Sequence, residues 1–107
     1  MCKLNKYKLK LDGIAQFQKD SILEYITQEF DMPGAAKRLE SNFNKAFEKI
    51  KRQPYICPVV QFDTPREHEY RKLNVRNYIA LYWIDEDCKT ITVSRIFHGS
   101  QDYLNKT

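Results

Sequence analysis

The segment EYRKLNVRNYIALYWIDEDCKTITVSRIF, residues 69–97, decides the fold. It contains three runs rich in aromatic, β-branched and other apolar residues, separated by polar turn-forming segments at 74–77 and 85–88. The expected strands are Glu69–Asn74, Tyr78–Ile84 and Thr90–Phe97. The middle run, YIALYWI, is apolar at every position, as in a central strand that is covered on both faces. These features predict a three-stranded antiparallel meander.

Two helices are expected upstream of the meander. Apolar residues recur at mostly helical intervals in GIAQFQKDSILEYITQEF, residues 13–30, and Asp12 before this segment suits an N-cap. A second helical pattern begins near Pro33, which fits the first turn of a helix, and ends before Pro54. Because the connection between the two patterns is very short, the helices should form an antiparallel hairpin.

The remaining segments flank this hairpin. Residues 6–11, KYKLKL, alternate lysine with apolar residues and predict a first strand with one face in solvent. Residues 53–68 carry three prolines and predict an extended connector, with a short edge strand at Val59–Phe62. We therefore expect one α+β domain over residues 1–107. It would contain a strand, a two-helix hairpin and the meander, with the helices packed on one sheet.

Composition and motifs exclude several protein classes. No run approaches the roughly 18 apolar residues that span a membrane, and MCKLNKYKLKL lacks the continuous apolar region of a secretory signal, so a cytoplasmic location is expected. Cys2, Cys57 and Cys88 share no CxxC or CxxH spacing, which predicts free thiols. The sequence has no Gly-rich phosphate loop, GxSxG or HExxH motif, so neither a cofactor nor a metal is expected.

The chain is basic, with a formal net charge of +4 and a pI near 9.0. Residues 37–52 hold six basic side chains and two acidic ones, whereas acidic residues gather at 85–87. This balance points to a polyanionic partner, either nucleic acid or an acidic protein segment. The basic run itself fits either a solvated helix face or an anion-binding surface.

Positive side chains of the meander are expected to form one patch. A two-residue hairpin loop at 75–76 and a four-residue loop at 85–88 would place Arg95 opposite Tyr78, with Arg71 in the next row of the same face. The patch depends on this register, because a slip of one residue reverses the faces. The alternative is that Arg95 lies at the rim of the sheet, stacks on Tyr78 and reaches solvent or a carboxylate.

His98, at the end of the last strand, has two interpretations. An imidazole with an ordinary pKa of about 6.5 would suit a general acid or base. It would equally cap the strand by bonding to backbone before Gly99 turns the chain. Asp102 and Tyr103 follow in a short polar tail.

Three segments of the sequence are similar to segments of a known group of proteins. They are AQFQKDSILEYI (15–26), YRKLNVRNYIALYWID (70–85) and ITVSRIFHGSQD (91–102). On these segments the chain resembles the RelE/ParE superfamily of toxins from type II toxin–antitoxin modules, which includes plasmid stabilisation proteins. The last segment looks like the ParE-type ending, in which Arg, two apolar residues, His and Gly end an alternating strand. Gln101 stands where many relatives have arginine.

The resemblance implies a toxin, and the two branches of the superfamily imply different targets. ParE-type members are associated with poisoning DNA gyrase and catalyse no reaction themselves. RelE-type members cleave mRNA on the ribosome and tend to carry an arginine after the aromatic residue that opens the middle strand, where this chain has Ile79 after Tyr78. A ParE-like gyrase poison is therefore expected. The alternatives are a ribosome-dependent endoribonuclease and an antitoxin-binding protein whose toxicity has decayed.

The resemblance also implies partners and site residues. The partners would be a cognate antitoxin with an acidic, partly disordered segment, gyrase or the ribosome as target, and operator DNA through the antitoxin. The residues expected to bind the target or the antitoxin are Arg71, Lys72, Arg76, Tyr78, Arg95 and His98. In a nuclease the catalytic candidates would be Arg71, Arg95, His98 and Tyr103.

Overall fold

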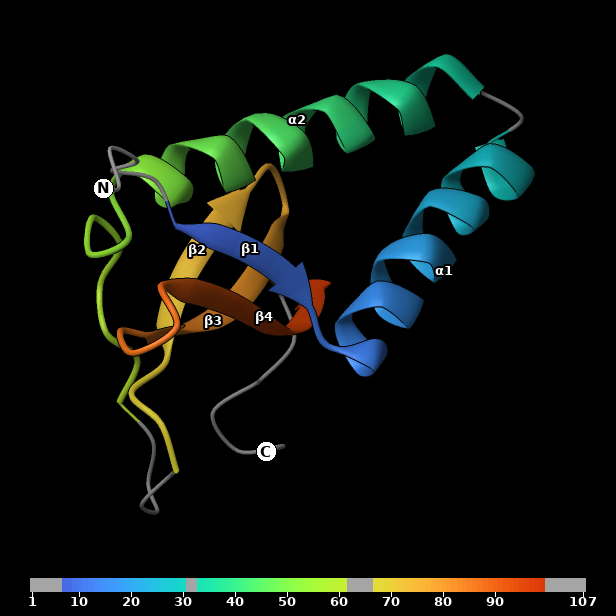
Figure 1. Ribbon diagram of the computed structural model, residues 1–107. Coiled ribbons are helices and arrows are strands. Elements are labelled where there is room, and N and C mark those ends of the chain that lie inside the picture. The colour runs from blue at the N-terminus through green and yellow to red at the C-terminus, as the bar shows by residue number, and fades with distance from the viewer. Residues whose placement is uncertain (1–6, 31–32, 62–66, 100–107) are drawn as a thin grey trace.

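The computed structural model describes residues 7–30, 33–61 and 67–99. Its elements follow the predicted order (Figure 1), and the α+β fold is confirmed. They are β1 (Lys8–Leu11), α1 (Gly13–Phe30), α2 (Pro33–Arg52), β2 (Arg71–Val75), β3 (Tyr78–Asp85) and β4 (Thr90–His98). The edge strand predicted at Val59–Phe62 is only an isolated bridge between Val59 and Arg71, and Phe62 lies outside the described residues.

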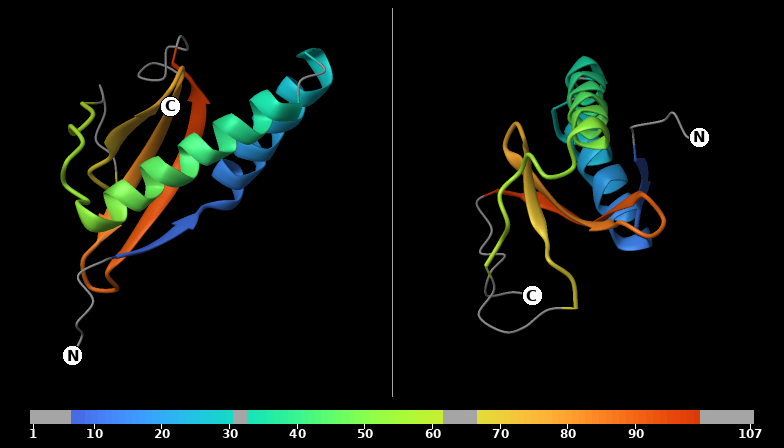
Figure 2. Two further views of the ribbon diagram at one scale, coloured as in Figure 1. Left: turned by 90° about the horizontal axis from the view of Figure 1, so that it is seen from above. Right: turned by 60° about the vertical axis from the view of Figure 1, so that its left-hand side comes forward.

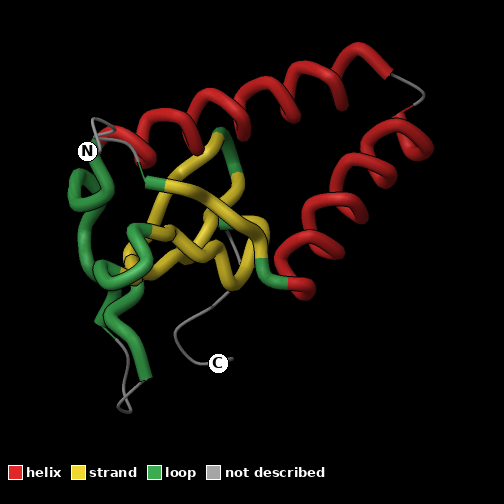
Figure 3. Tube along the Cα trace, viewed as in Figure 1, coloured by secondary structure: helices red, strands yellow, loops and turns green. Residues whose placement is uncertain are grey.

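The four strands, drawn in yellow in Figure 3, form one sheet in the order β1-β4-β3-β2. Strands β2, β3 and β4 make the predicted antiparallel meander. Strand β1 extends this meander as a parallel neighbour of β4, from Lys8 opposite Thr90 to Leu11 opposite Val93. The alternating pattern predicts β1 as a strand but does not identify its neighbour, because the paired segments are far apart in the sequence.

Both helices lie on one face of the sheet (Figure 2). Helix α2 is amphipathic and buries Leu39, Phe43, Phe47 and Ile50 against apolar residues of the meander. Each such side chain contributes roughly 1.5–3 kcal/mol when it leaves water. Helix α1 is anchored less deeply, since Ala15 is the one fully buried residue among those of α1 whose burial is described.

The start of α1 is attached to β4. The carbonyl of Asp12 accepts a hydrogen bond from the backbone N–H of Gln16 at 2.9 Å, and its carboxylate accepts one from Gly13 at 3.0 Å. Asp12 therefore caps the helix, as predicted. Its own backbone N–H donates to the carbonyl of Val93 at 2.9 Å, which fixes the end of β1 and the beginning of α1 beside β4.

The register of the meander differs from the predicted one. Arg76 and Asn77 form the loop of the first hairpin, so Val75 lies opposite Tyr78, and Tyr78 lies opposite His98. The prediction placed the loop one residue earlier. It also placed Arg95 opposite Tyr78, which was wrong.

A β-bulge in β4 accounts for the position of Arg95. Leu81 lies opposite Arg95, whereas its neighbour Tyr82 lies opposite Val93, so Ser94 is an extra residue in β4. Without the bulge, alternation would place Arg95 on the same face as Val93. With it, Arg95 turns to the face opposite the helices, and Ile96 enters the core.

Two side chains satisfy the backbone of the bulge. The side-chain carbonyl of Gln18, in α1, accepts a hydrogen bond from the backbone N–H of Ile96 at 2.7 Å. The guanidinium of Arg95 donates to the carbonyl of Ser94 at 2.8 Å. Gln18 therefore connects α1 to the strand that it covers, and Arg95 supports the bulge in which it lies.

Replacing Gln18 with alanine should lower the free energy of unfolding by about 1–3 kcal/mol, because the N–H of Ile96 would lose its acceptor. Gln18→Glu keeps an acceptor oxygen at the same position and should lose less. Urea denaturation of the two variants measures the difference. Equal stability of Gln18→Ala and the unmodified chain would contradict this role.

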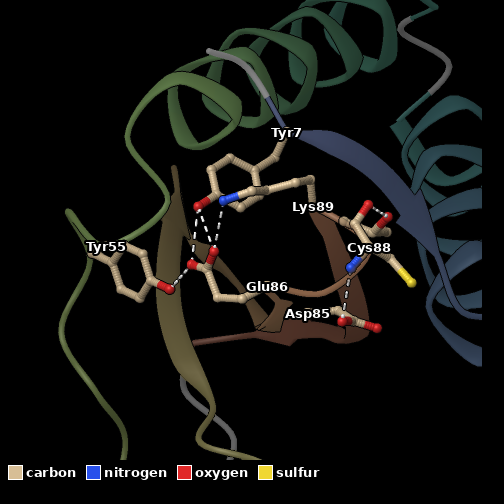
Figure 4. Close-up of polar contacts among 7 residues, drawn as sticks. Tyr7, Tyr55, Asp85, Glu86, Cys88 and Lys89 are labelled. Carbon is tan, nitrogen blue, oxygen red and sulfur yellow. Dashed lines mark hydrogen bonds and ion pairs between the residues drawn. The ribbon is translucent and has the colours of Figure 1, made fainter. Parts of the chain in front are cut away.

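Glu86, in the β3–β4 turn, joins three parts of the chain (Figure 4). Its carboxylate accepts hydrogen bonds from the hydroxyl groups of Tyr7, at 2.9 and 3.0 Å, and of Tyr55. Lys89 lies 3.0 Å from the same carboxylate and over the ring of Tyr7. The hydrogen bonds from Tyr55, Lys89 and Tyr7 lower the pKa of Glu86 to about 2, and the bond to Glu86 raises the pKa of Tyr55 to about 12.

The lowered pKa of Glu86 predicts a specific acid sensitivity. The stabilisation is present above the ordinary carboxyl pKa of 4.5 and is lost as the pH falls through the folded-state pKa of about 2. Glu86→Gln should therefore weaken the dependence of unfolding free energy on pH between about 4.5 and 2. Asp87→Asn, on the same turn, is the matched control. Identical pH profiles for Glu86→Gln and the control would argue against the contribution of Glu86.

Cys57 and Cys88 are free thiols, as predicted, and Cys2 lies outside the described residues. Within the described ranges, neither helix has both the length and the apolar character needed to cross a membrane.

Candidate functional site

A hollow of about 560 Å³ lies where the helical hairpin meets one end of the sheet. Its walls come from α1, from the first half of α2, and from the sheet end formed by the β2–β3 loop and the end of β4. The lining residues are Tyr25, Ile26, Ala35, Arg38, Leu39, Asn42, Arg76, Asn77, Tyr78 and His98. In Figure 1 the connected ends of the two helices project past the sheet, so the hollow has helices on one side and strand ends on the other.

Tyr78 connects the hollow to the core. Its ring lies 6.3 Å from that of Phe43, between centroids, and 5.3 Å from that of His98, with the His98 ring nearly perpendicular at 82°. Burial raises the pKa of the Tyr78 hydroxyl above its ordinary value, with a smaller contribution from Tyr25. The phenol is therefore neutral at physiological pH and serves as a hydrogen-bond donor or acceptor within an apolar surround.

Two arginines give the hollow its charge. Arg38 comes from α2, and Arg76 comes from the β2–β3 loop. No aspartate or glutamate lines the hollow within the described part of the chain. Asn42 follows Arg38 by four residues, so both lie on the same side of α2. The arrangement suits an anionic group held by guanidinium donors above an apolar floor.

The β2–β3 loop holds an unusual backbone. Arg76 has φ 57°, in the left-handed region that costs a non-glycine residue roughly 1–2 kcal/mol. The backbone N–H of Gly99 donates to the carbonyl of Asn77 at 2.7 Å, which ties the end of β4 to this loop. A Cβ at Gly99 would lie 3.1 Å from that carbonyl oxygen, so glycine allows the close approach that places His98 beside Tyr78.

The structure brings together three of the predicted site residues, Arg76, Tyr78 and His98, and places the others elsewhere. Because of the bulge, Arg95 lies on the face opposite the helices, in the same row as Leu81 and Lys72. Tyr103 lies outside the described residues.

Arg71 does not share a face with Arg95, so the predicted common patch of these two arginines was wrong. Arg71 lies opposite Tyr82 on the helix side of the sheet. Its guanidinium donates to the carbonyls of Cys57, at 2.6 Å, and Tyr55, at 3.3 Å. It also lies 3.6 Å from the carboxylate of Glu69. These contacts attach the connector to β2. They also give the guanidinium of Arg71 its hydrogen-bond and ion-pair partners within the protein.

Sequence reasoning missed the helical half of the hollow. Tyr25 was assigned only to a helix pattern, Arg38 was one of the basic residues in the run at 37–52, and Asn42 was not singled out. The available signal was the spacing of Arg38 and Asn42, each one residue before a core position, Leu39 or Phe43. Such residues lie at the border between the buried and exposed faces of α2, where a neighbouring element forms a groove.

An exposed apolar surface lies beside the hollow on α1. Ile14, Phe17 and Tyr25 are 50%, 72% and 55% exposed, and their spacing places them on one side of the helix. This side differs from the one that faces the core, which carries Ala15, Ile22 and Ile26. Helix α1 therefore has two apolar sides, one of which is uncovered in the described structure.

Comparison with known proteins agrees with this architecture. The family described as the ParE toxin of the type II toxin–antitoxin system parDE matches residues 10–103. No curated protein matches the chain. Three solved structures share the fold, each with a low sequence identity.

The first is from the chromosomal ParDE toxin–antitoxin system of P. aeruginosa, with a TM-score of 0.64 and 15% identity, over 89% of this chain and 98% of that one. The second is from the RelBE2 toxin–antitoxin complex of Mycobacterium tuberculosis, with a TM-score of 0.55 and 18% identity, over 87% and 98%. The third is from the archaeal RelE–RelB complex of Pyrococcus horikoshii OT3, with a TM-score of 0.58 and 11% identity, over 90% and 98%. Since the family match spans most of its residues, the chain belongs to the ParE toxin family of type II toxin–antitoxin systems.

Proposed function

We propose that the chain inhibits bacterial growth by binding and poisoning DNA gyrase, and that a cognate antitoxin neutralises it by covering the hollow. Membership of the ParE family supports a toxin with an antitoxin partner. The toxin would act in the cytoplasm and catalyse no reaction itself, and its complex would reach operator DNA through the antitoxin. The observation that carries the proposal is the hollow, which Arg38 and Arg76 line together with the neutral phenol of Tyr78.

The chemistry of the hollow fits a protein segment as its ligand. Leu39 and Ile26 supply apolar surface, the two arginines supply donors for carboxylates, and Asn42 supplies an amide. A protein interface of this kind has an apolar centre and a polar, charged rim. A protein segment that carries acidic side chains next to apolar ones would therefore complement the hollow.

The exposed side of α1 extends this binding surface. Phe17 and Tyr25 are large aromatic side chains, which are the residue types that most often anchor protein interfaces. An antitoxin segment that lies along α1 and enters the hollow would bury these side chains and the arginines together. If a disordered acidic segment becomes ordered on this surface, neutralisation is expected to weaken as salt concentration rises.

The test is to induce the chain alone in bacteria and to follow incorporation of labelled thymidine and labelled methionine. Loss of thymidine incorporation before methionine incorporation is expected. The purified chain should also inhibit supercoiling by gyrase or trap cleaved DNA. Growth that continues without the antitoxin would instead indicate a decayed toxin, and unaffected gyrase would exclude this target.

A second function, mRNA cleavage on the ribosome, is favoured by one observation. His98 and Tyr78 are in ring contact within a hollow that also holds Arg38 and Arg76. An imidazole that lines the same hollow as two guanidinium groups supplies the components for proton transfer and for stabilising a phosphorane. Mapping of mRNA 5′ ends after induction tests this function. Cleavage that disappears in His98→Gln would support a nuclease, and intact mRNA during growth arrest would exclude it.

A further inference from the structure

Helix α2 carries all of the net positive charge of the chain. Its 20 residues include six basic and two acidic side chains, a net charge of +4. The whole chain has 18 basic and 14 acidic residues, also a net charge of +4, so the residues outside α2 are neutral in sum. Charge concentrated on one element is more informative than net charge, because it identifies the surface that a polyanion would contact.

Most of this charge lies on the side of α2 that faces away from the core. Lys37, Lys45, Lys49 and Arg52 are exposed and follow one another at intervals that return to the same side of the helix, opposite Phe43. The steps from 45 to 49 and from 49 to 52 advance about 6 Å and about 4.5 Å along the axis, and the helix is about 30 Å long. Figure 1 shows α2 along the outside of the molecule, with its far side uncovered by other elements.

The charges on this side are available to a partner. No ion pair joins Lys37, Lys45, Lys49 or Arg52 to an acidic residue among the described residues. Of the two carboxylates of α2, that of Glu48 lies 2.8 Å from Lys51, and Glu40 is exposed. Lys45, Lys49 and Arg52 line a shallow hollow of about 520 Å³. Its other lining residues are Ser41, Asn44, Glu48 and Gln53.

The side chains on the outer side of α2 favour nucleic acid over an acidic protein as the binding partner. Protein interfaces are anchored by buried aromatic and apolar side chains. The large apolar side chains exposed in the described structure lie on α1 and at residues 55–56, and none lies on α2. A phosphate backbone needs only a row of cations and hydrogen-bond donors, which is what this side of α2 offers.

We propose that the outer side of α2, with Lys45, Lys49 and Arg52 at its centre, binds the phosphate backbone of nucleic acid independently of base sequence. This surface is separate from the hollow and from the exposed side of α1. The proposal goes beyond the proposed function. A chain that acts on gyrase or on the ribosome would use this surface to hold DNA or RNA near its target. Three phosphate contacts give log affinity a slope of about −2.7 against log salt.

The experiment measures binding of the full chain to a fluorescent 20-base-pair DNA duplex of arbitrary sequence by anisotropy, between 50 and 200 mM salt. The unmodified chain should lose about 40-fold or more in affinity over this range, from the slope above. The triple variant Lys45→Gln, Lys49→Gln, Arg52→Gln should bind weakly, with a salt slope smaller by about 2.7. Glutamine is a good helix former, and circular dichroism checks that α2 is retained.

Two controls make the result specific. Lys8→Gln, Lys10→Gln, Lys19→Gln removes the same net charge from β1 and α1 and should keep nearly all of the slope. Equal losses in the two triple variants would mean that only net charge matters and would overturn the proposal. A labelled polyglutamate peptide should bind much more weakly than the duplex. Equally tight binding of that peptide, lost in the α2 variant, would assign the surface to an acidic protein and would also overturn it.

Discussion

Phe43→Ala is expected to lower the free energy of unfolding by about 3–5 kcal/mol. Phe43 is fully buried at the centre of α2, and its ring lies 5.9 Å from that of Phe47 and 6.3 Å from that of Tyr78. Removing it leaves a cavity between the helices and the sheet that the neighbouring rings fill only in part. Small domains have only about 5–15 kcal/mol of stability in total, so this loss is a large fraction of it.

Urea denaturation followed by circular dichroism measures the effect of Phe43→Ala. The matched control is Phe17→Ala, the same substitution on the exposed side of α1, which should change stability by no more than about 0.5 kcal/mol. A loss below about 1 kcal/mol for Phe43→Ala would contradict the packing described for α2. The variant should also loosen the packing around the hollow, because the ring of Phe43 packs near that of Tyr78, which lines the hollow.

The second large effect concerns the hollow itself. The double variant Arg38→Glu, Arg76→Glu should abolish growth arrest when the chain is induced without its antitoxin. Both arginines line the hollow, and reversing their charge would repel the acidic side chains proposed for the segment that binds there. Like charges brought together at an interface cost several kcal/mol, which corresponds to about 100-fold or more in affinity.

Colony counts after induction measure this effect. Lys8→Glu, Lys10→Glu, on the exposed positions of β1, makes the same change in net charge away from the hollow and should leave growth arrest intact. Circular dichroism of the purified variants confirms that each one folds. Arrest that persists in the Arg38→Glu, Arg76→Glu variant would show that the target binds elsewhere.

The sequence predicts most of the elements because their signals are local. The spacing of Leu39, Phe43 and Phe47 gives α2, Pro33 gives its start, and the apolar run of β3 gives a strand buried on both faces, which the structure confirms for residues 79–82. These patterns reflect periodicities that a helix or a strand imposes on its own segment. Tertiary contacts do not have to be known in order to detect them.

The candidate site was predicted only in part, because it depends on register. Strict alternation in β4 would place Arg95 with Val93, and one extra residue, Ser94, reverses that result. The bulge is maintained by Gln18 from α1, a residue far away in the sequence. A single-sequence pattern therefore had no means of detecting it. Arg76, Tyr78 and His98 were among the predicted binding residues and line one hollow, but Arg38 and Asn42 approach them only through the packing of α2 on the sheet.

The parallel pairing of β1 with β4 has a consequence for synthesis of the protein on the ribosome. Strand β1 is synthesised first, and β4 is the last of the described elements to be synthesised. Strand β1 can therefore pair with β4 only after β4 has emerged from the ribosome. Long-range closure of this kind is slow compared with helix formation. In a nascent chain, both helices are therefore present before the complete sheet on which they pack. They are also present before His98, which lines the hollow. Harmful activity of the proposed kind would begin only after β4 has been synthesised, which leaves the antitoxin an interval in which to be present first.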